Sequence, residues 1–274
     1  MRKIFVPTDF SESSEIALKH ALKISEITGA AIEAVNVIHL GNDVLVNDAG
    51  EIVDCSKWDQ DRITQMGGEA KAKMEAWKQK VGDKFSGKVR FGKPVEFLLK
   101  EIAVSDPSLV VIGKADSGQL KNLFTGTMTD QLIRRSSVPF LVVQEELPKN
   151  GVRNLLISGH LDLITQPYLN LLDAFVRMRG AKMYVLPAKK RSEAKEVLPE
   201  ILVNYAKNNN WEIEETAQTG HSDLSAALKQ KDEELNIDVF AVTVRFRKSF
   251  QLFGNKELYA LTSQLHKPIL IFNN

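Results

Sequence analysis

The sequence has 274 residues, of which 43% are hydrophobic and 26% charged, which is ordinary for a globular protein. Domains usually contain about 100–200 residues, so this length predicts two of them. The 36 basic and 35 acidic residues are balanced. This balance argues against a protein that binds nucleic acid through a basic surface.

The single cysteine, Cys55, excludes an intrachain disulfide and a metal site built from cysteines. No apolar run approaches the roughly 20 residues that a membrane-spanning helix needs. The apolar stretch that follows Lys3 is too short for a signal peptide and is typical of a buried strand. We therefore expect a soluble, cytoplasmic protein that does not enter a membrane.

Short apolar runs alternate with helical stretches in the first half of the chain, a pattern typical of a parallel sheet. The predicted strands are Lys3–Thr8, Ala31–Ile38, Lys88–Phe91, Leu109–Ile112 and Phe140–Val143. The predicted helices are Ser11–Thr28, Asp61–Val81, Val95–Val104 and Thr127–Arg135. Ser11 suits the N-cap of the first helix, and Gly29 suits its C-terminal cap.

The second half repeats this order. Its predicted strands are Asn154–Ser158, Lys182–Leu186, Glu212–Ala217, Val239–Val244 and Ile269–Phe272. Its predicted helices include Leu163–Arg179, closed by Gly180, and Ala194–Lys207. The repeated order predicts two tandem α/β domains, each a doubly wound, Rossmann-like parallel sheet. We place the domains at residues 1–147 and 151–274, joined by the polar stretch Glu145–Gly151.

The first copy is longer than the second. Gly29 matches Gly180 and Gly92 matches Gly220, and these spacings give the first copy about 23 additional residues. We place them in the loop Gly41–Asp59, which is either a lid or a solvated excursion.

In a doubly wound sheet, ligands bind beyond the carboxyl ends of the strands, where strand order reverses. Gly113 directly follows the fourth predicted strand, and Gly126 with Thr127 opens the next helix. Glycine allows close approach to a ligand, and a helix start with free amides suits a phosphate. Thr127 followed by Asp130 is equally an ordinary capping arrangement.

Three separated motifs together resemble the universal stress protein family. They are the segment Pro7-Thr8-Asp9-Phe10-Ser11, Gly113 followed thirteen residues later by Gly126-Thr127, and Val138-Pro139 before an apolar strand. The family pattern is G-x2-G-x9-G-(S/T). The resemblance covers the first half fully and the second in outline. It implies domains like the adenine nucleotide alpha hydrolases, ATP or another adenine nucleotide as ligand, and a role in stress response.

The resemblance also implies roles for individual residues. The first strand would bring Pro7, Thr8 and Asp9 to the site, with Asp9 facing the adenosine end. Val37 would line the adenine pocket, and Ile112 and Gly113 would pass beneath the ribose and phosphates. The groups presented to the phosphates would come from Gly126, Thr127, Met128 and Thr129. Asp9 has an alternative as a helix-capping carboxylate, and Val37 as a core residue.

Asp116 departs from the family pattern, because it replaces the second glycine. A carboxylate there would repel phosphates: two unit charges about 5 Å apart interact by roughly 3 kcal/mol at an effective dielectric constant near 20. Alternatively, Asp116 could hold a magnesium ion shared with the phosphates. The sequence does not choose between these interpretations.

The second half departs further. Gly159 is predicted to take the place of Asp9, Thr243 replaces the first glycine, and Gly254-Asn255 is the only remnant of the Gly-Thr pair. We therefore predict a non-binding partner domain and at most one nucleotide per chain. The resemblance and the apolar strands Phe140–Val143 and Ile269–Phe272 predict that the two copies pair as an internal pseudo-dimer. A homodimer of whole chains stays open.

Enzymatic activity has little support in the sequence. The histidines show no metal-ligand spacing, and neither a P-loop nor a Gly-x-Ser-x-Gly nucleophile is present. We expect a nucleotide-responsive regulatory protein with at most weak ATP hydrolysis. The alternative is a family member that has lost ATP binding and serves as an interaction scaffold or binds another ligand.

Overall fold

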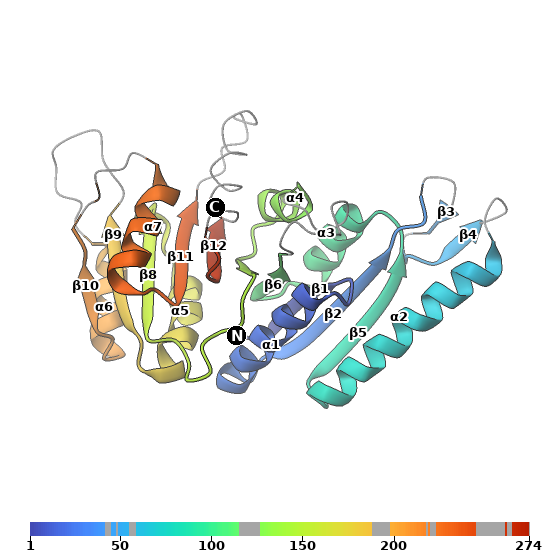
Figure 1. Cartoon of the computed structure of the whole chain (residues 1–274), viewed down its shortest axis with the longest axis horizontal. Helices are drawn as coiled ribbons and strands as arrows, with labels where there is room; N and C mark the ends of the chain where they lie inside the picture. Colours follow the sequence, from blue (N-terminus) through green and yellow to red (C-terminus); the bar gives the residue numbers. More distant parts are fainter. Residues whose placement is uncertain are drawn as a thin grey trace.

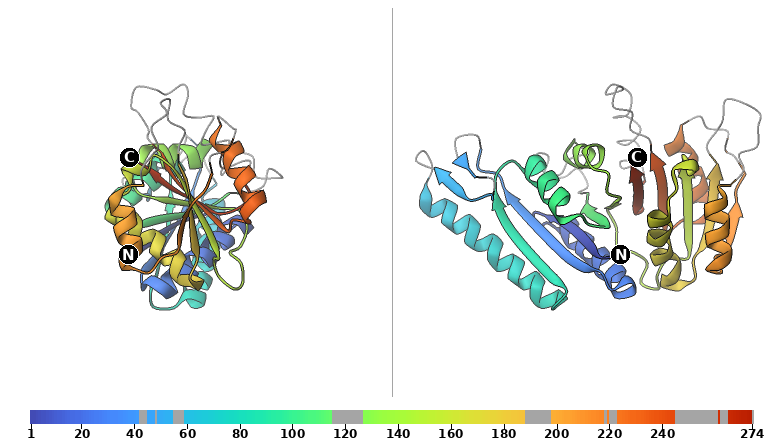
Figure 2. Two further views of the ribbon diagram at one scale, coloured as in Figure 1. Left: turned by 90° about the vertical axis from the view of Figure 1, so that its left-hand side faces the viewer. Right: turned by 180° about the vertical axis from the view of Figure 1, so that it is seen from behind.

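The computed structural model describes residues 1–41, 45–47, 49–54, 59–114, 127–187, 198–217, 219, 223–244, 261 and 265–273. Their dominant feature is a ten-stranded sheet in the order β10-β9-β8-β11-β12-β7-β6-β1-β2-β5 (Figure 1). Seen along the sheet, the strands fan out with the strong twist expected of an open sheet (Figure 2).

The first half of the chain forms five parallel strands in the order β5-β2-β1-β6-β7. The strands are β1 (Lys3–Thr8), β2 (Ala31–Ile38), β5 (Phe85–Phe91), β6 (Leu109–Gly113) and β7 (Phe140–Val143). The helices are α1 (Glu12–Thr28), α2 (Gln60–Val81), α3 (Pro94–Ser105) and α4 (Thr127–Arg135). Ser11 caps α1 at its N-terminus and Gly29 at its C-terminus, as predicted.

Strand β5 begins three residues before the predicted strand Lys88–Phe91. Ser86 and Gly87 are weak strand formers, which is why the sequence pattern missed them. Gly87 has a packing reason here: a Cβ on it would lie 2.3 Å from Cγ of Met74 on α2. The missing side chain therefore lets α2 sit close against the edge of the sheet.

The second half has the same strand order, β10-β9-β8-β11-β12. Its strands are β8 (Asn154–Gly159), β9 (Lys182–Pro187), β10 (Ile213–Glu215), β11 (Val239–Val244) and β12 (Ile269–Asn273). Its helices are α5 (Gln166–Arg179), α6 (Glu200–Asn208) and α7 (Leu224–Leu235), and a 3-10 turn spans Leu161–Leu163. Strand β10 is shorter than the predicted Glu212–Ala217. Helix α6 begins later than the predicted Ala194, and residues 194–197 lie outside the described residues.

The two halves meet through their last strands. Strand β12 pairs with β7 in antiparallel orientation, with Leu141 opposite Leu270. Every other pairing in this sheet is parallel. The predicted pairing of the two copies is therefore confirmed, and each apolar strand covers an edge that would otherwise be open.

Helices cover both faces of the sheet. One buried apolar cluster combines residues of α1, α2, α5 and α6 with one face of the strands. A second cluster combines α3, α4 and α7 with the other face. Both clusters contain residues from both halves, so the core is continuous across the seam between β7 and β12.

The stretch between the halves is less solvated than its polar composition predicts. Leu147 and Val152 are 4% and 0% exposed and belong to the larger apolar cluster. His20 on α1 lies 2.8 Å, through Nε2, from the carbonyl oxygen of Glu145. The Lys23 ammonium also lies close to two carbonyl oxygens of this stretch. Helix α1 therefore holds the start of the connection.

The described part of the predicted loop Gly41–Asp59 contains an antiparallel pair of short strands, β3 (Leu45–Val46) and β4 (Ile52–Asp54). The amide of Phe91 donates to the carbonyl of Gly50 at 3.0 Å. Gly50 is buried, and a Cβ on it would lie 2.7 Å from the ring of Phe97. This part of the segment is thus anchored on β5 and α3 at Gly50, while Leu45 and Val53 are exposed.

Candidate functional site

The candidate site lies at the carboxyl edge of the first half. Strand β1 lies between β2 and β6, and α1 connects β1 to β2 while the chain returns to the other side of β1 with β6. The ends of β1 and β6 therefore flank the point where strand order reverses, the usual ligand position in this architecture. Pro7, Thr8 and Gly113 lie at these neighbouring strand ends.

Asp9 is part of the N-terminal cap of α1. Its Oδ1 accepts hydrogen bonds from the amide of Ser11 at 2.9 Å, the hydroxyl of Ser11 at 2.5 Å and the hydroxyl of Ser14 at 2.7 Å. The geometry matches the capping alternative raised from the sequence. All three bonds use Oδ1, so Oδ2 lies outside this network.

The turn after Asp9 is fixed by aromatic packing. Phe10 has a φ of 60°, an uncommon conformation for a residue other than glycine. Its ring packs edge-on against Trp77 of α2 at 5.5 Å. The indole N–H of Trp77 in turn donates to Glu15 at 2.5 Å. The β1–α1 turn is therefore held from α2, which positions Asp9 independently of any ligand.

Gly113 has a packing reason as well as the predicted ligand reason. A Cβ on Gly113 would lie 2.0 Å from the carbonyl oxygen of Ser13, in the first turn of α1. No side chain can occupy that space unless α1 moves. The glycine therefore allows the start of α1 to rest directly on the end of β6.

The apolar residues predicted for the site belong to the core on the α3–α4 side. Ile112 is fully buried, Met128 is 7% exposed, and Val37 packs against the same cluster. The side chain of Met128 therefore points into the core, so a phosphate would meet its backbone amide and not its side chain. The core alternative for Val37 fits this position.

Buried polar atoms accompany this edge. Within the described part of the chain, no hydrogen-bond partner is found for Oδ1 of Asn36, Oγ1 of Thr129 or Oδ1 of Asp130. Asn36 pairs with Thr8 in the sheet and donates to the Thr8 carbonyl at 2.8 Å. An unsatisfied buried polar atom costs free energy, so this edge contains acceptors and a hydroxyl suited to a further polar group.

Charge at the start of α4 is mixed. Burial raises the pKa of the Asp130 carboxyl to about 6, while the positive charges of Arg134 and Lys114 act in the opposite direction. Lys114 follows Gly113 directly and donates its amide to the Val143 carbonyl at 2.8 Å. Asn36 and Lys114 were not among the predicted site residues, although each is a polar residue close to the end of an apolar strand.

Several predicted site residues are not tested by the structure. Asp116 and Gly126 lie outside the described residues, and for Thr127 the structure describes only its place at the start of α4. Among the residues that are described, no group of three or more His, Cys, Asp or Glu side chains could hold a metal ion. No helix in the described ranges is both long and apolar enough to span a bilayer.

The structure aligns β8 with β1 one residue away from the alignment that we predicted. Ile4 pairs with Leu109 in the first half, and Leu155 pairs with Val239 in the second. Counted from these pairs, the counterpart of Asp9 is His160, and Gly159 is the counterpart of Thr8. Thr243 does occupy the place of Gly113, as predicted. A one-residue misalignment is easy to make between strands of similar apolar composition.

The end of β8 is built for a glycine. Gly159 has a φ of 98°, and a Cβ on it would lie 2.2 Å from the carbonyl oxygen of Thr243. Gly159 and Thr243 are paired neighbours in the sheet, at the place that Thr8 and Gly113 take in the first half. Thr243 itself is 1% exposed.

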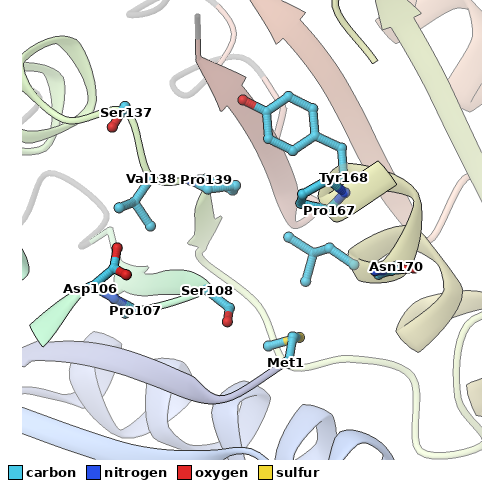
Figure 3. A pocket seen from close by; sticks show the side chains of 11 residues that line it. Met1, Asp106, Pro107, Ser108, Ser137, Val138, Pro139, Pro167, Tyr168 and Asn170 are labelled. Atoms are coloured by element: carbon cyan, nitrogen blue, oxygen red, sulfur yellow. The ribbon is translucent and has the colours of Figure 1, made fainter. Parts of the chain in front are cut away.

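A pocket of about 320 Å³ lies elsewhere, at the amino ends of β6 and β7. Ser137, Val138 and Pro139 line one wall, and Pro167 and Tyr168 of the second half line the other (Figure 3). It is at the opposite edge of the first half from the candidate site. No local sequence pattern predicts this pocket, because it forms between segments of the two halves.

Comparison with known proteins decides the family. The model of the universal stress protein family matches residues 1–144. This chain belongs to the universal stress protein family.

Relatives of this universal stress protein cover about half of it. It is 28% identical over 155 residues to universal stress protein MJ0577 of Methanocaldococcus jannaschii, which spans 53% of this chain and 96% of the relative. It is 25% identical over 146 residues to universal stress protein MJ0531 of the same organism, spanning 53% and 82%.

A solved structure extends the likeness of fold to the whole chain. The crystal structure of a universal stress protein from Archaeoglobus fulgidus superposes with a TM-score of 0.71 at 17% identity, covering 99% of this chain and 98% of the other. The predicted Rossmann-like α/β fold is thereby confirmed.

Proposed function

We propose that this universal stress protein binds ATP or another adenine nucleotide at the carboxyl edge of its first half. It acts in the stress response through its conformation or its partners, without needing turnover. The observation that carries the proposal is the reversal of strand order between β1 and β6, with Gly113 at the strand end and the start of α4 beside it.

The nucleotide would be held in two parts. Asp9, through the oxygen outside the capping network, and the polar end of β2 would meet the adenosine. The phosphates would meet backbone amides at Gly113 and at the start of α4, where the helix dipole favours negative charge. Lys114 adds a positive charge at this end of β6. The buried polar atoms of Asn36 and Thr129 support a polar ligand at this edge.

We further propose two tandem domains, 1–147 and 151–274, of which only the first binds nucleotide. The matching strand order of the two halves supports the division. Thr243, which places a side chain where the first half has Gly113, supports a second domain without a site. We place the protein in the cytoplasm, on composition alone.

A rival function has specific support. Asp9 is explained by capping and Gly113 by its contact with α1, so neither residue requires a ligand. Carboxyl groups at Asp116 and Asp130 would oppose phosphates unless a magnesium ion lies between them. The rival is therefore a family member that has lost ATP and works as an interaction scaffold.

The decisive experiment is native mass spectrometry of the purified full chain, followed by calorimetric titration with ATP and adenosine. We expect one adenine nucleotide per chain. Gly126→Asp should abolish binding, whereas Gly254→Asp, at the counterpart position of the second half, should leave it unchanged. A wild-type protein that carries no nucleotide and gives no heat with ATP would establish the rival. Phosphate release measured in parallel would detect weak hydrolysis.

A further inference from the structure

Asn273, at the end of β12, reaches across the seam between the halves. Its side-chain amide donates to the carbonyl oxygens of Ile133 at 2.6 Å and Ser136 at 2.5 Å. Ile133 lies in the last turn of α4, and Ser136 follows that helix. Asn273 is 3% exposed. A residue of the second half therefore caps a helix of the first.

The contact meets a need of α4. The last four carbonyl groups of a helix have no partner within the helix, and they carry its negative dipole end. The amide of Asn273 supplies two donors to this end. Its Oδ1 has no hydrogen-bond partner among the residues that the structure describes, so the side chain serves here as a donor.

Asn273 is itself held from the second half. The hydroxyl of Tyr168, on α5, donates to the backbone carbonyl of Asn273 at 2.9 Å. The Tyr168 ring stacks on Phe272 with centroids 4.4 Å apart. Nearby, the 320 Å³ pocket separates Ser137 and Val138 from Pro167 (Figure 3). The end of α4 is therefore tied to the second half beside a hollow, with Asn273 forming the bridge.

The other end of α4 belongs to the proposed nucleotide site. The helix has nine residues, so its two ends are only about 13 Å apart. Met128, Leu132 and Ile133 anchor its buried side. A short helix moves as a unit, so a shift at its C-terminus also shifts the amides at its N-terminus.

We propose that Asn273 is a positioning residue for the nucleotide site of the first half. By capping α4 it sets where the amides of the first turn lie relative to the phosphates. The inference rests on the proposed function, because it assigns those amides to the phosphates. It gives the second half a role in a site to which it contributes no ligand contact.

The test compares Asn273→Ala with Tyr168→Phe in the full chain, and Asn273→Ser retains one donor if the alanine variant fails to fold. Both Asn273→Ala and Tyr168→Phe remove hydrogen bonding at the same point of β12, but only the first frees α4. Titrated with ATP and adenosine, Asn273→Ala should weaken ATP about tenfold and adenosine less than twofold. Asn273→Ser should fall between, and Tyr168→Phe should leave both affinities unchanged.

Hydrogen exchange of the ligand-free proteins gives a readout that needs no nucleotide. Asn273→Ala should speed amide exchange along α4 from Asp130, whose amide is the first that can bond within the helix, to the last turn, and Tyr168→Phe should not. Equal loss of ATP and adenosine affinity, unchanged affinities, or faster exchange confined to the last turn of α4 would each overturn the inference. A wild type that binds no nucleotide would refute the proposed function, while the exchange data would still decide whether Asn273 controls the start of α4.

Discussion

Acidification should weaken the fold through His20, at the contact between α1 and the connection of the two halves. Burial lowers the pKa of this imidazole to about 4, while the hydrogen bond to the Glu145 carbonyl acts to raise it. Lys23 also lowers the pKa, and Glu146 raises it. At neutral pH, Nε2–H donates to Glu145, and Nδ1 has no hydrogen-bond partner in the described ranges.

The sign follows from proton binding. Between pH 6.5 and 4 the unfolded chain binds a proton at His20 that the folded protein does not. The stabilisation is therefore complete above about pH 6.5 and is lost as the pH falls towards 4. For a pKa of about 4 when folded and 6.5 when unfolded, the loss between pH 7 and pH 5 is about 2 kcal/mol.

The assay is urea unfolding followed by circular dichroism at pH 7 and pH 5, for wild type and His20→Gln. Glutamine keeps a donor for the Glu145 carbonyl and does not titrate. The wild type should lose about 2 kcal/mol more than the variant over this interval. Other titrating groups cancel in the difference, including Asp130, whose raised pKa has the opposite effect. Equal pH dependence in both proteins would refute the reasoning.

Three further predictions concern the first half. If Asp116 repels phosphates, Asp116→Gly should raise the affinity for ATP by about one to two orders of magnitude and leave the affinity for adenosine nearly unchanged. Calorimetric titration with and without magnesium checks this: weaker binding of Mg-ATP alone would identify Asp116 as a magnesium ligand, and unchanged affinities would contradict the placement of the loop. Gly113→Ala should lower the free energy of unfolding in urea by at least about 2 kcal/mol, because its Cβ would meet the Ser13 carbonyl. The control Gly68→Ala, on the open surface of α2, should raise it by about 0.5–1 kcal/mol. Equal effects of the two substitutions would contradict the packing argument. Glu33 is buried between the ammonium groups of two lysines, and although burial acts to raise the pKa of its carboxyl group, hydrogen bonds from Lys88, Ser105 and Lys3 lower it to about 2. Glu33→Gln should therefore lower the free energy of unfolding by roughly 2–3 kcal/mol at pH 7 and abolish the part of the wild-type acid sensitivity that lies between about pH 4.5 and 2. An unchanged acid titration of unfolding would exclude this role.

Most of the fold could be predicted because its signals are local. Buried parallel strands appear as short apolar runs such as Leu109–Ile112, and the cap residues Ser11 and Gly29 mark the ends of α1. The pairing of β7 with β12 followed from their apolar composition and the family resemblance. Each of these features depends on residues close together in the chain or on a pattern repeated in both halves.

The features of the fold that the sequence did not predict depend on contacts between distant residues. Ser86 and Gly87 were missed as strand residues because the reason for the glycine is Met74 on another element. The anchoring of Gly50 depends on Phe97 in the same way. The pocket and the contact of Asn273 with α4 exist only after the two halves have come together.

The candidate site shows a different limit. A glycine at a strand end permits either a ligand or another backbone to come close, and Gly113 is in contact with Ser13 whether or not a nucleotide binds. Asp9 likewise combines a capping role through Oδ1 with a second carboxylate oxygen outside the capping network. Packing and binding can therefore use the same residue, and the sequence pattern alone does not separate them.

The pairing of β7 with β12 gives the second half a role even if, as we propose, it binds no nucleotide. Strand β7 is apolar and would be an open edge if the first half stood alone, and β12 covers it. This duty needs an apolar strand of the right register and places no demand on the ends of β8 and β11. Those ends can therefore carry other residues, such as Thr243 at the place of Gly113. The Asn273 amide, which β12 sends across the seam, meets the helix on which the proposed phosphate site depends. Covering an edge and positioning α4 are thus two tasks that the second half can perform without binding a nucleotide.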